Sequence, residues 1–165
     1  MHLEVANSAT LDDLDAFLRR TWLECCGHMS AFTINRRMDT EDPDWGDDPE
    51  GEEDSLFEPI GEVLQPGDVV GYDYDFGSTT HLTIRVRAQN PFRSGEGPVV
   101  VLARNAPLEW TCSVCGAPAT QVCPDCEWKG TGFLCENCVP GHARHADRLL
   151  PVVNSPRMGV CGYAG

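Results

Sequence analysis

Eight cysteine and histidine side chains between residues 112 and 145 constrain the fold of this chain more than any other feature. They form four pairs, and two residues separate the members of each pair. The pairs are Cys112/Cys115, Cys123/Cys126, Cys135/Cys138 and His142/His145. Since two donors at this spacing can reach one tetrahedral metal ion, the eight ligands predict two zinc ions per chain.

The spacers between the pairs indicate how the ligands are shared. Seven, eight and three residues separate the successive pairs, and this spacing resembles that of B-box and RING-like cross-braced modules. The resemblance implies that the first and third pairs hold one ion and that the second and fourth hold the other. Two independent ribbons, filled in sequence, are the alternative. In both arrangements each ion has four protein ligands, so no coordination position is open and the zinc is expected to be structural.

The segment 107–150 has little else to hold it together. The apolar side chains among the ligands are Val114, Val122, Trp128, Phe133 and Leu134. With so small a core, metal binding and folding are expected to be one event. Disulfides would need an oxidising compartment, but the first 18 residues have no apolar signal core. We therefore expect reduced cysteines, a cytoplasmic location and no membrane segment.

The charge of the chain is concentrated in one segment. Ten acidic and no basic residues lie between Asp39 and Asp54, so of the formal net charge of −14 only −4 remains for the rest. Proline and glycine within this segment predict a solvated acidic loop over 39–54. The stretch from Trp110 to Gly165 is neutral and lacks the basic stripe of phosphate-binding proteins. A protein partner is therefore expected rather than nucleic acid.

Before the cysteine pairs, the sequence predicts an α+β domain over 1–106, and a tail over 151–165 is expected to pack back. Thr10 is a typical N-cap, followed by acidic residues that favour the positive end of a helix. Apolar residues then recur at helical spacing, which predicts an amphipathic helix that ends near Gly27. The recurring residues are Leu11, Leu14, Leu18, Trp22 and Cys25. A strand over 28–35, a short turn or helix around 59–64 and a strand over 99–103 are also expected.

A hairpin is the clearest strand signal. Val70, Tyr72 and Tyr74 alternate with polar residues or glycine, as do Leu82, Ile84 and Val86 in the second strand. A loop of three residues, 77–79, would put both apolar sets on one face. This register predicts that Asp75 lies opposite His81. With Asp73, these two form a weak candidate acid–base site, for which a surface ion pair is the simpler interpretation.

Two stretches carry a resemblance to a known family. TLDDLDAFLRRTWLECCGHMSAFTI and YDYDFGSTTHLTIRV resemble the plasmid pRiA4b ORF-three-like family, whose relatives are labelled TnpR-type passenger proteins of an insertion element. The resemblance covers about residues 10–104 and implies an α+β fold with a curved, mostly antiparallel sheet packed on helices, in a plasmid or mobile-element context. Ser78, Thr79 and Thr80 stand where the family usually has an Asp and then a Trp, so a polar site of the family would be altered here.

Three cysteines lie outside the four pairs. Cys25 and Cys26 are adjacent, His28 follows, and Cys161 lies in the C-terminal segment. Packing of small apolar thiols in a core is the expected role. A third metal site made by these four residues is the alternative.

These observations favour a zinc-binding, non-catalytic interaction or adaptor protein with Trp110, Trp128 and Phe133 as candidate contacts. One alternative is a DNA-binding or recombination accessory protein of a mobile element. It would require several arginines to converge on one surface: Arg19, Arg20, Arg36, Arg37, Arg85, Arg87 and Arg93. The other alternative is an enzyme that uses Asp73, Asp75 and His81.

Overall fold

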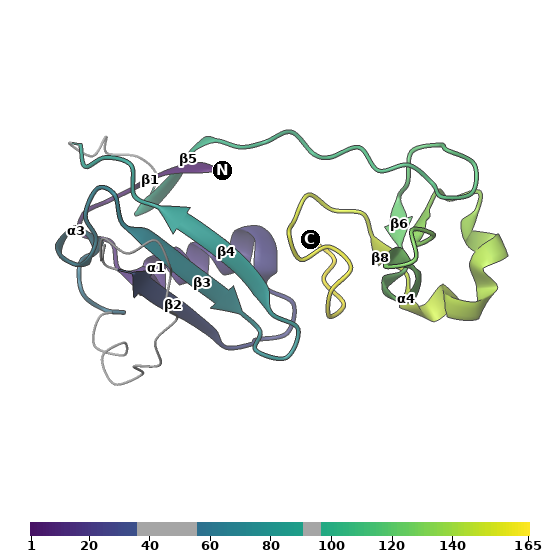
Figure 1. Cartoon of the computed structure of the whole chain (residues 1–165), viewed down its shortest axis with the longest axis horizontal. Coiled ribbons are helices and arrows are strands. Elements are labelled where there is room, and N and C mark those ends of the chain that lie inside the picture. The colour runs from purple at the N-terminus through teal and green to yellow at the C-terminus, as the bar shows by residue number, and fades with distance from the viewer. Residues whose placement is uncertain (36–55, 91–96) are drawn as a thin grey trace. The chain divides into compact units, whose positions relative to one another are not determined.

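A computed structural model of the chain describes residues 1–35, 56–90 and 97–165. It contains two compact units (Figure 1). The sheet unit comprises Met1–Leu18 and Met29–Asn105, and the cysteine-rich unit comprises Arg19–His28 and Ala106–Gly165. The predicted acidic loop over 39–54, as well as Arg36, Arg37 and Arg93, lies outside the described residues.

The sheet unit mixes helices with antiparallel strands, as predicted for its fold class. Its elements are β1 (His2–Val5), α1 (Leu11–Leu18), β2 (Ser30–Asn35), α3 (Ile60–Val63), β3 (Val69–Tyr74), β4 (Thr80–Arg85) and β5 (Val99–Ala103). β2, β3 and β4 form a sheet in that order, while β1 and β5 pair in a second sheet of two strands. The strand over 99–103 is confirmed, but its partner β1 was not predicted, because the two segments are far apart in the sequence.

Helix α1 begins where the sequence predicts and ends before Gly27, near which the sequence predicts its end. The Thr10 hydroxyl oxygen accepts a hydrogen bond from the Asp13 amide at 3.1 Å, and the Asp13 carboxylate accepts one from the Thr10 amide at 3.0 Å. This reciprocal pair is a capping box, so the predicted N-cap is confirmed. The α-helix stops at Leu18 and a π-helical turn, η1 (Arg19–Leu23), follows it. Because a π turn takes an extra residue, Leu23 is buried whereas the predicted Trp22 is partly exposed.

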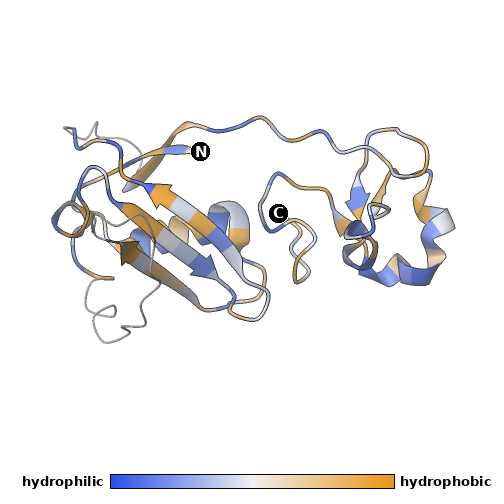
Figure 2. Ribbon diagram, in the orientation of Figure 1, coloured by the Kyte–Doolittle hydropathy of each residue, from blue (hydrophilic) through white to orange (hydrophobic). Residues whose placement is uncertain are grey.

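The core of the sheet unit lies where α1 meets the three-stranded sheet. Val70, Tyr72 and Tyr74 on β3 are completely buried, and the Tyr72 ring packs on Phe32 of β2 with 4.7 Å between ring centroids. Asp15 of α1 accepts hydrogen bonds from the Tyr72 hydroxyl at 2.7 Å and from the Ser30 hydroxyl at 2.6 Å. In Figure 2, hydrophobic and hydrophilic residues alternate along these strands. The predicted apolar face of β3 is therefore the buried one.

The register of the hairpin differs from the prediction. Tyr72 lies opposite Leu82, and His81 lies opposite Asp73 rather than Asp75. The cause is the loop: Asp75 adopts a positive φ of 65° and its carboxylate accepts hydrogen bonds from the Gly77 amide at 3.0 Å and the Ser78 hydroxyl at 3.1 Å. This Asx-type turn lengthens the loop to five residues, 75–79, and shifts the pairing by two positions. The apolar face is preserved because a two-residue shift keeps side chains on the same side.

The cysteine-rich unit has short regular elements. They are β6 (Gln121–Val122), α4 (Pro124–Glu127), β7 (Phe133–Leu134), the 3-10 helical segment η2 (Val139–Arg148) and β8 (Leu150–Pro151). The strands form an antiparallel sheet in the order β7-β6-β8. Val122 of β6 and Leu134 of β7 are buried, whereas η2 is largely hydrophilic (Figure 2). Around the four cysteine and histidine pairs, apolar packing is thus limited to a few side chains.

Candidate metal centres

The four predicted ligand pairs converge into two groups in the cysteine-rich unit. The all-cysteine cluster consists of Cys112, Cys115, Cys135 and Cys138. The mixed cluster consists of Cys123, Cys126, His142 and His145. In each group the potential ligand atoms all lie within 4.8 Å of one another. The first pair lies with the third and the second with the fourth, which is the interleaved arrangement.

The distances between sulfur atoms in the all-cysteine cluster match those expected for thiolates bound to one metal ion. The Cys115 Sγ atom lies 3.6 Å from the Sγ atoms of both Cys135 and Cys138. Two thiolates bound to one tetrahedral zinc ion at about 2.3 Å would lie about 3.8 Å apart. A disulfide would bring the sulfur atoms to about 2.0 Å. All nine cysteines are free, so this group can hold a metal ion with four protein ligands.

The mixed cluster contains a buried atom that a metal ion would satisfy. His145 Nδ1 lies 3.6 Å from Cys123 Sγ and 3.4 Å from Cys126 Sγ. His142 Nε2 is buried and has no hydrogen-bond partner within the described part of the chain. A buried polar atom without a partner costs about 1–3 kcal/mol. A bound metal ion would remove that cost, and thiolate with imidazole is a donor set compatible with zinc.

Tight backbone turns bring the cysteine pairs together. The Cys126 amide donates to the Cys123 carbonyl at 3.1 Å, and the Cys138 amide donates to the Cys135 carbonyl at 2.9 Å. Gly132 allows the chain to pass close to one of these turns. A Cβ atom at this position would lie 2.5 Å from the Glu127 amide nitrogen and 2.8 Å from the Cys123 carbonyl oxygen. Local turns therefore position the pairs, and Gly132 lets the chain pass close to the turn that follows Cys123.

The protein environment separates the pKa values of the thiols in these clusters. The Cys135 backbone amide donates to Cys112 and lowers its pKa to about 6, although burial opposes this change. The hydrogen bond that Cys138 shares with Cys115 raises the pKa of Cys138 to about 12, and burial raises the pKa of Cys123. At neutral pH a metal ion must therefore displace protons from some of its ligands, so metal affinity is expected to rise with pH.

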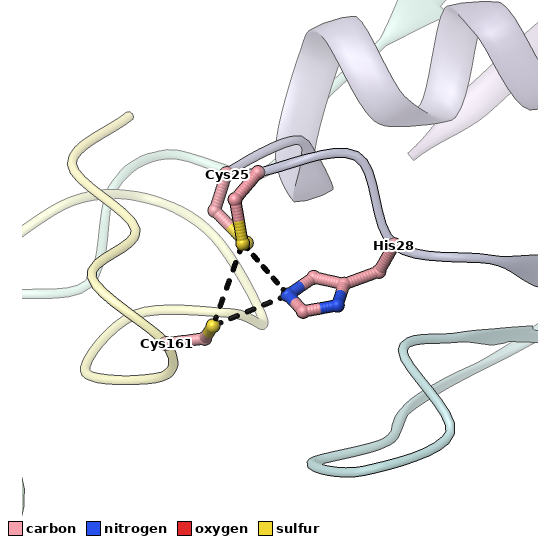
Figure 3. Close-up of side chains that lie close together, drawn as sticks. Cys25, His28 and Cys161 are labelled. Carbon is pink, nitrogen blue, oxygen red and sulfur yellow. Dashed lines mark hydrogen bonds between the residues drawn. The ribbon is translucent and has the colours of Figure 1, made fainter.

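The remaining three cysteines are not core residues. Cys25, Cys26, His28 and Cys161 form the terminal cluster, in which the potential ligand atoms again lie within 4.8 Å of one another. Figure 3 shows Cys25, His28 and Cys161 directed towards a common point. Cys26 and Cys161 are exposed, so the prediction of packing in a core is wrong. The structure thus brings together the four residues that the sequence offers as an alternative third metal site. Spacing alone gives a weak signal for this cluster, because Cys161 is distant in the chain and adjacent cysteines are not a common ligand pattern.

The candidate acid–base residues form a surface pair. His81 Nδ1 lies 2.6 Å from Asp73 Oδ1, and 71% of the His81 side chain is exposed. The Asp75 carboxylate, by contrast, is engaged in the turn that follows β3. The three residues therefore do not form the predicted constellation, and the pair that does form is on the solvent-exposed face of β4.

The candidate aromatic contacts differ in exposure. The Trp110 and Phe133 rings stack at 4.4 Å with 4° between their planes, which uses both rings in packing within the cysteine-rich unit. Trp128 is 77% exposed. Its indole nitrogen donates to the Asp125 carbonyl at 2.8 Å, and the Lys129 ammonium lies 4.6 Å from its ring centroid. These contacts hold the Trp128 ring in place while leaving most of it exposed.

Comparisons with known proteins give no relative for this chain. No protein family, curated protein or solved structure matches it. Among the residues that the structure describes, no helix is both long and apolar enough to span a bilayer.

Proposed function

We propose that this chain is a zinc-binding, non-catalytic interaction protein in which the cysteine-rich unit is held by two structural zinc ions. The observation that carries this proposal is the convergence of eight donors into the all-cysteine and mixed clusters. Four protein ligands fill a tetrahedral zinc ion and leave no position for water or substrate. Such closed sites stabilise a fold rather than activate a nucleophile.

The small apolar core supports a structural role for these ions. Val122 and Leu134 are buried next to buried ligands such as Cys123 and Cys135. Units of this size need a disulfide or a metal ion in addition to their core. Since the cysteines are free, zinc supplies the required free energy.

Trp128 is the proposed contact with a protein partner. Tryptophan is enriched among the interface residues that contribute most to binding. An exposed ring held by a hydrogen bond and a cation–π contact loses little conformational freedom when a partner binds. Nucleic acid is a less suitable partner because the stretch from Trp110 to Gly165 carries no net charge. A cytoplasmic location and a mobile-element context belong to the same proposal and rest on the sequence alone.

The test compares proteins retained from a lysate of the source cells by three forms of the full chain. These are the unchanged chain, Trp128→Ala and Leu108→Ala, which removes another exposed apolar side chain. Zinc content is measured in each form. The proposal predicts a protein that is retained by the unchanged chain and Leu108→Ala, and is lost with Trp128→Ala or after zinc removal. Retention that is independent of both Trp128 and zinc would contradict it.

A further inference from the structure

The terminal cluster lies outside the two centres on which the proposed function rests. All four residues belong to the cysteine-rich unit: three lie in the segment 19–28 and Cys161 lies near the C-terminus. We propose that Cys25, Cys26, His28 and Cys161 bind a third zinc ion, which fastens the C-terminal segment 155–165 to the segment 19–28.

The geometry of the cluster is that of ligands around one ion. Cys26 Sγ lies 3.7 Å from Cys25 Sγ and 3.8 Å from Cys161 Sγ. Thiolates that share a tetrahedral zinc ion lie about 3.8 Å apart. His28 Nε2 lies 2.9 Å from Cys26 Sγ and 3.2 Å from Cys161 Sγ, so the imidazole points its nitrogen at the sulfur atoms (Figure 3). Three thiolates and one imidazole complete a four-ligand set for zinc.

The charge of the surroundings provides a second, independent observation. Arg157 is completely buried and lies against Cys25, to which its side chain is hydrogen-bonded. Negative charge beside a buried guanidinium offsets part of the cost of its burial. Three thiolates, a neutral imidazole and one divalent ion together carry one net negative charge. A zinc-loaded cluster therefore carries a net charge that is complementary to the charge of Arg157.

Other contacts already bring the two segments together. The Ser155 hydroxyl donates to the Trp22 carbonyl at 2.6 Å and accepts from the Arg157 amide at 2.8 Å. The C-terminal segment thus approaches the segment 19–28 through hydrogen bonds that do not involve the ligands. A zinc ion bound to the terminal cluster would hold the two segments together.

The third ion should exchange more readily than the other two. The terminal cluster has two exposed ligands, Cys26 and Cys161, and no buried one. The all-cysteine cluster has two buried ligands and one exposed ligand, and the mixed cluster has one buried ligand and none that is exposed. A chelator in solution can reach exposed ligands first. The occupancy of the terminal cluster would then respond to the concentration of free zinc while the all-cysteine and mixed clusters stay filled.

Elemental analysis of the full chain tests this site. Protein is purified without added zinc and passed through gel filtration before measurement. Three zinc ions are expected in the unchanged chain and two in Cys161→Ser. Ser155→Ala is the matched control, because it removes the hydrogen bond to Trp22 and keeps every ligand, so three ions are expected. Two ions in both the unchanged chain and Cys161→Ser would overturn the proposal, because a third ion would then be absent or too weakly bound to survive gel filtration.

Alkylation of the unchanged chain gives a second test that does not depend on the folding of a variant. Mass spectrometry identifies the cysteines that are alkylated before and after a brief treatment with a weak chelator. We expect Cys25, Cys26 and Cys161 to be protected from alkylation before the treatment. The chelator should remove their protection first, while the all-cysteine cluster stays protected. Equal labelling of these three thiols with and without chelator would overturn the third site. Loss of protection in the all-cysteine cluster would instead contradict the proposed function.

Discussion

The two units of this protein bury different kinds of side chain. In the sheet unit, large apolar side chains from α1, β2 and β3 are buried together, among them Leu11, Phe32 and Tyr72. In the cysteine-rich unit the completely buried side chains include Val122 and Cys123, and several of its buried residues are potential metal ligands. The sheet unit therefore carries a core of large apolar side chains, whereas potential metal ligands make up a substantial part of what the cysteine-rich unit buries.

This difference indicates how each unit should respond to change. A conventional core loses stability in proportion to the apolar contacts that are removed. A metal-held unit loses most of its stability when a single ligand is removed, because binding of the ion and folding are linked. The sheet unit should consequently tolerate chelation, and the cysteine-rich unit should tolerate it poorly.

The largest effect is expected for Cys135→Ser, which removes a buried ligand of the all-cysteine cluster. Apparent binding free energies of structural zinc sites are about 10–16 kcal/mol, so loss of one ligand should unfold the surrounding elements β6 and β7. Amide NMR spectra should show collapsed dispersion for this unit alone. Cys25→Ser is the matched thiol control and should leave β6 and β7 folded. Unchanged spectra for Cys135→Ser would contradict the dependence on metal.

Leu11→Ala tests the core of the sheet unit. Leu11 is completely buried, and truncation of such a side chain costs about 2–5 kcal/mol. Denaturant unfolding should report this loss in the sheet unit, with no change in metal content. Met29→Ala removes a side chain that is 69% exposed in the same unit and should have little effect. A change in metal content for Leu11→Ala would show that the two units depend on each other.

Gly132→Ala tests the close approach behind the mixed cluster. The added Cβ atom would lie 2.5 Å from the Glu127 amide nitrogen, and the backbone there must shift. Overpacking of this kind costs about 1–3 kcal/mol, so the unit should unfold at a lower chelator concentration. Gly141→Ala is the matched control, because its Cβ atom would meet nothing within 4 Å. Equal chelator sensitivity of the two variants would contradict this role.

The smallest effect is expected for Thr10→Ala, which removes half of the capping box of α1. Loss of an N-cap side chain typically costs about 1 kcal/mol. Thermal unfolding should show this loss in the sheet unit, while Ser8→Ala, a nearby exposed position, should stay close to the unchanged chain. If Ser8→Ala lowered the stability as much as Thr10→Ala, the loss could not be assigned to the N-cap.

Local features of the fold could be predicted from the sequence. The Thr10 cap and the buried face of β3 depend on residues a few positions apart, and both agree with the structure. The hairpin register could not be predicted, because it depends on the positive φ of Asp75 and on the hydrogen bonds of its carboxylate. The end of α1 could not be predicted either, because a π-helical turn changes which side chain is buried.

Metal ligands show the same contrast between local and distant signals. Two-residue spacing is enough to identify the eight side chains of the all-cysteine and mixed clusters from the sequence. The terminal cluster has no such spacing, since Cys161 comes from the far end of the chain. Its four side chains come together only when the segment 19–28 and the C-terminal segment fold as parts of one unit.

Hydrogen exchange of the full chain, measured with and without a strong chelator, tests the central claim most directly. The account predicts that chelation removes protection from peptides that contain Val122 and Leu134 and leaves peptides that contain Val70 and Tyr72 protected. Protection that persists at Val122 and Leu134 after complete metal removal would show that the cysteine-rich unit folds without metal, and would contradict the account.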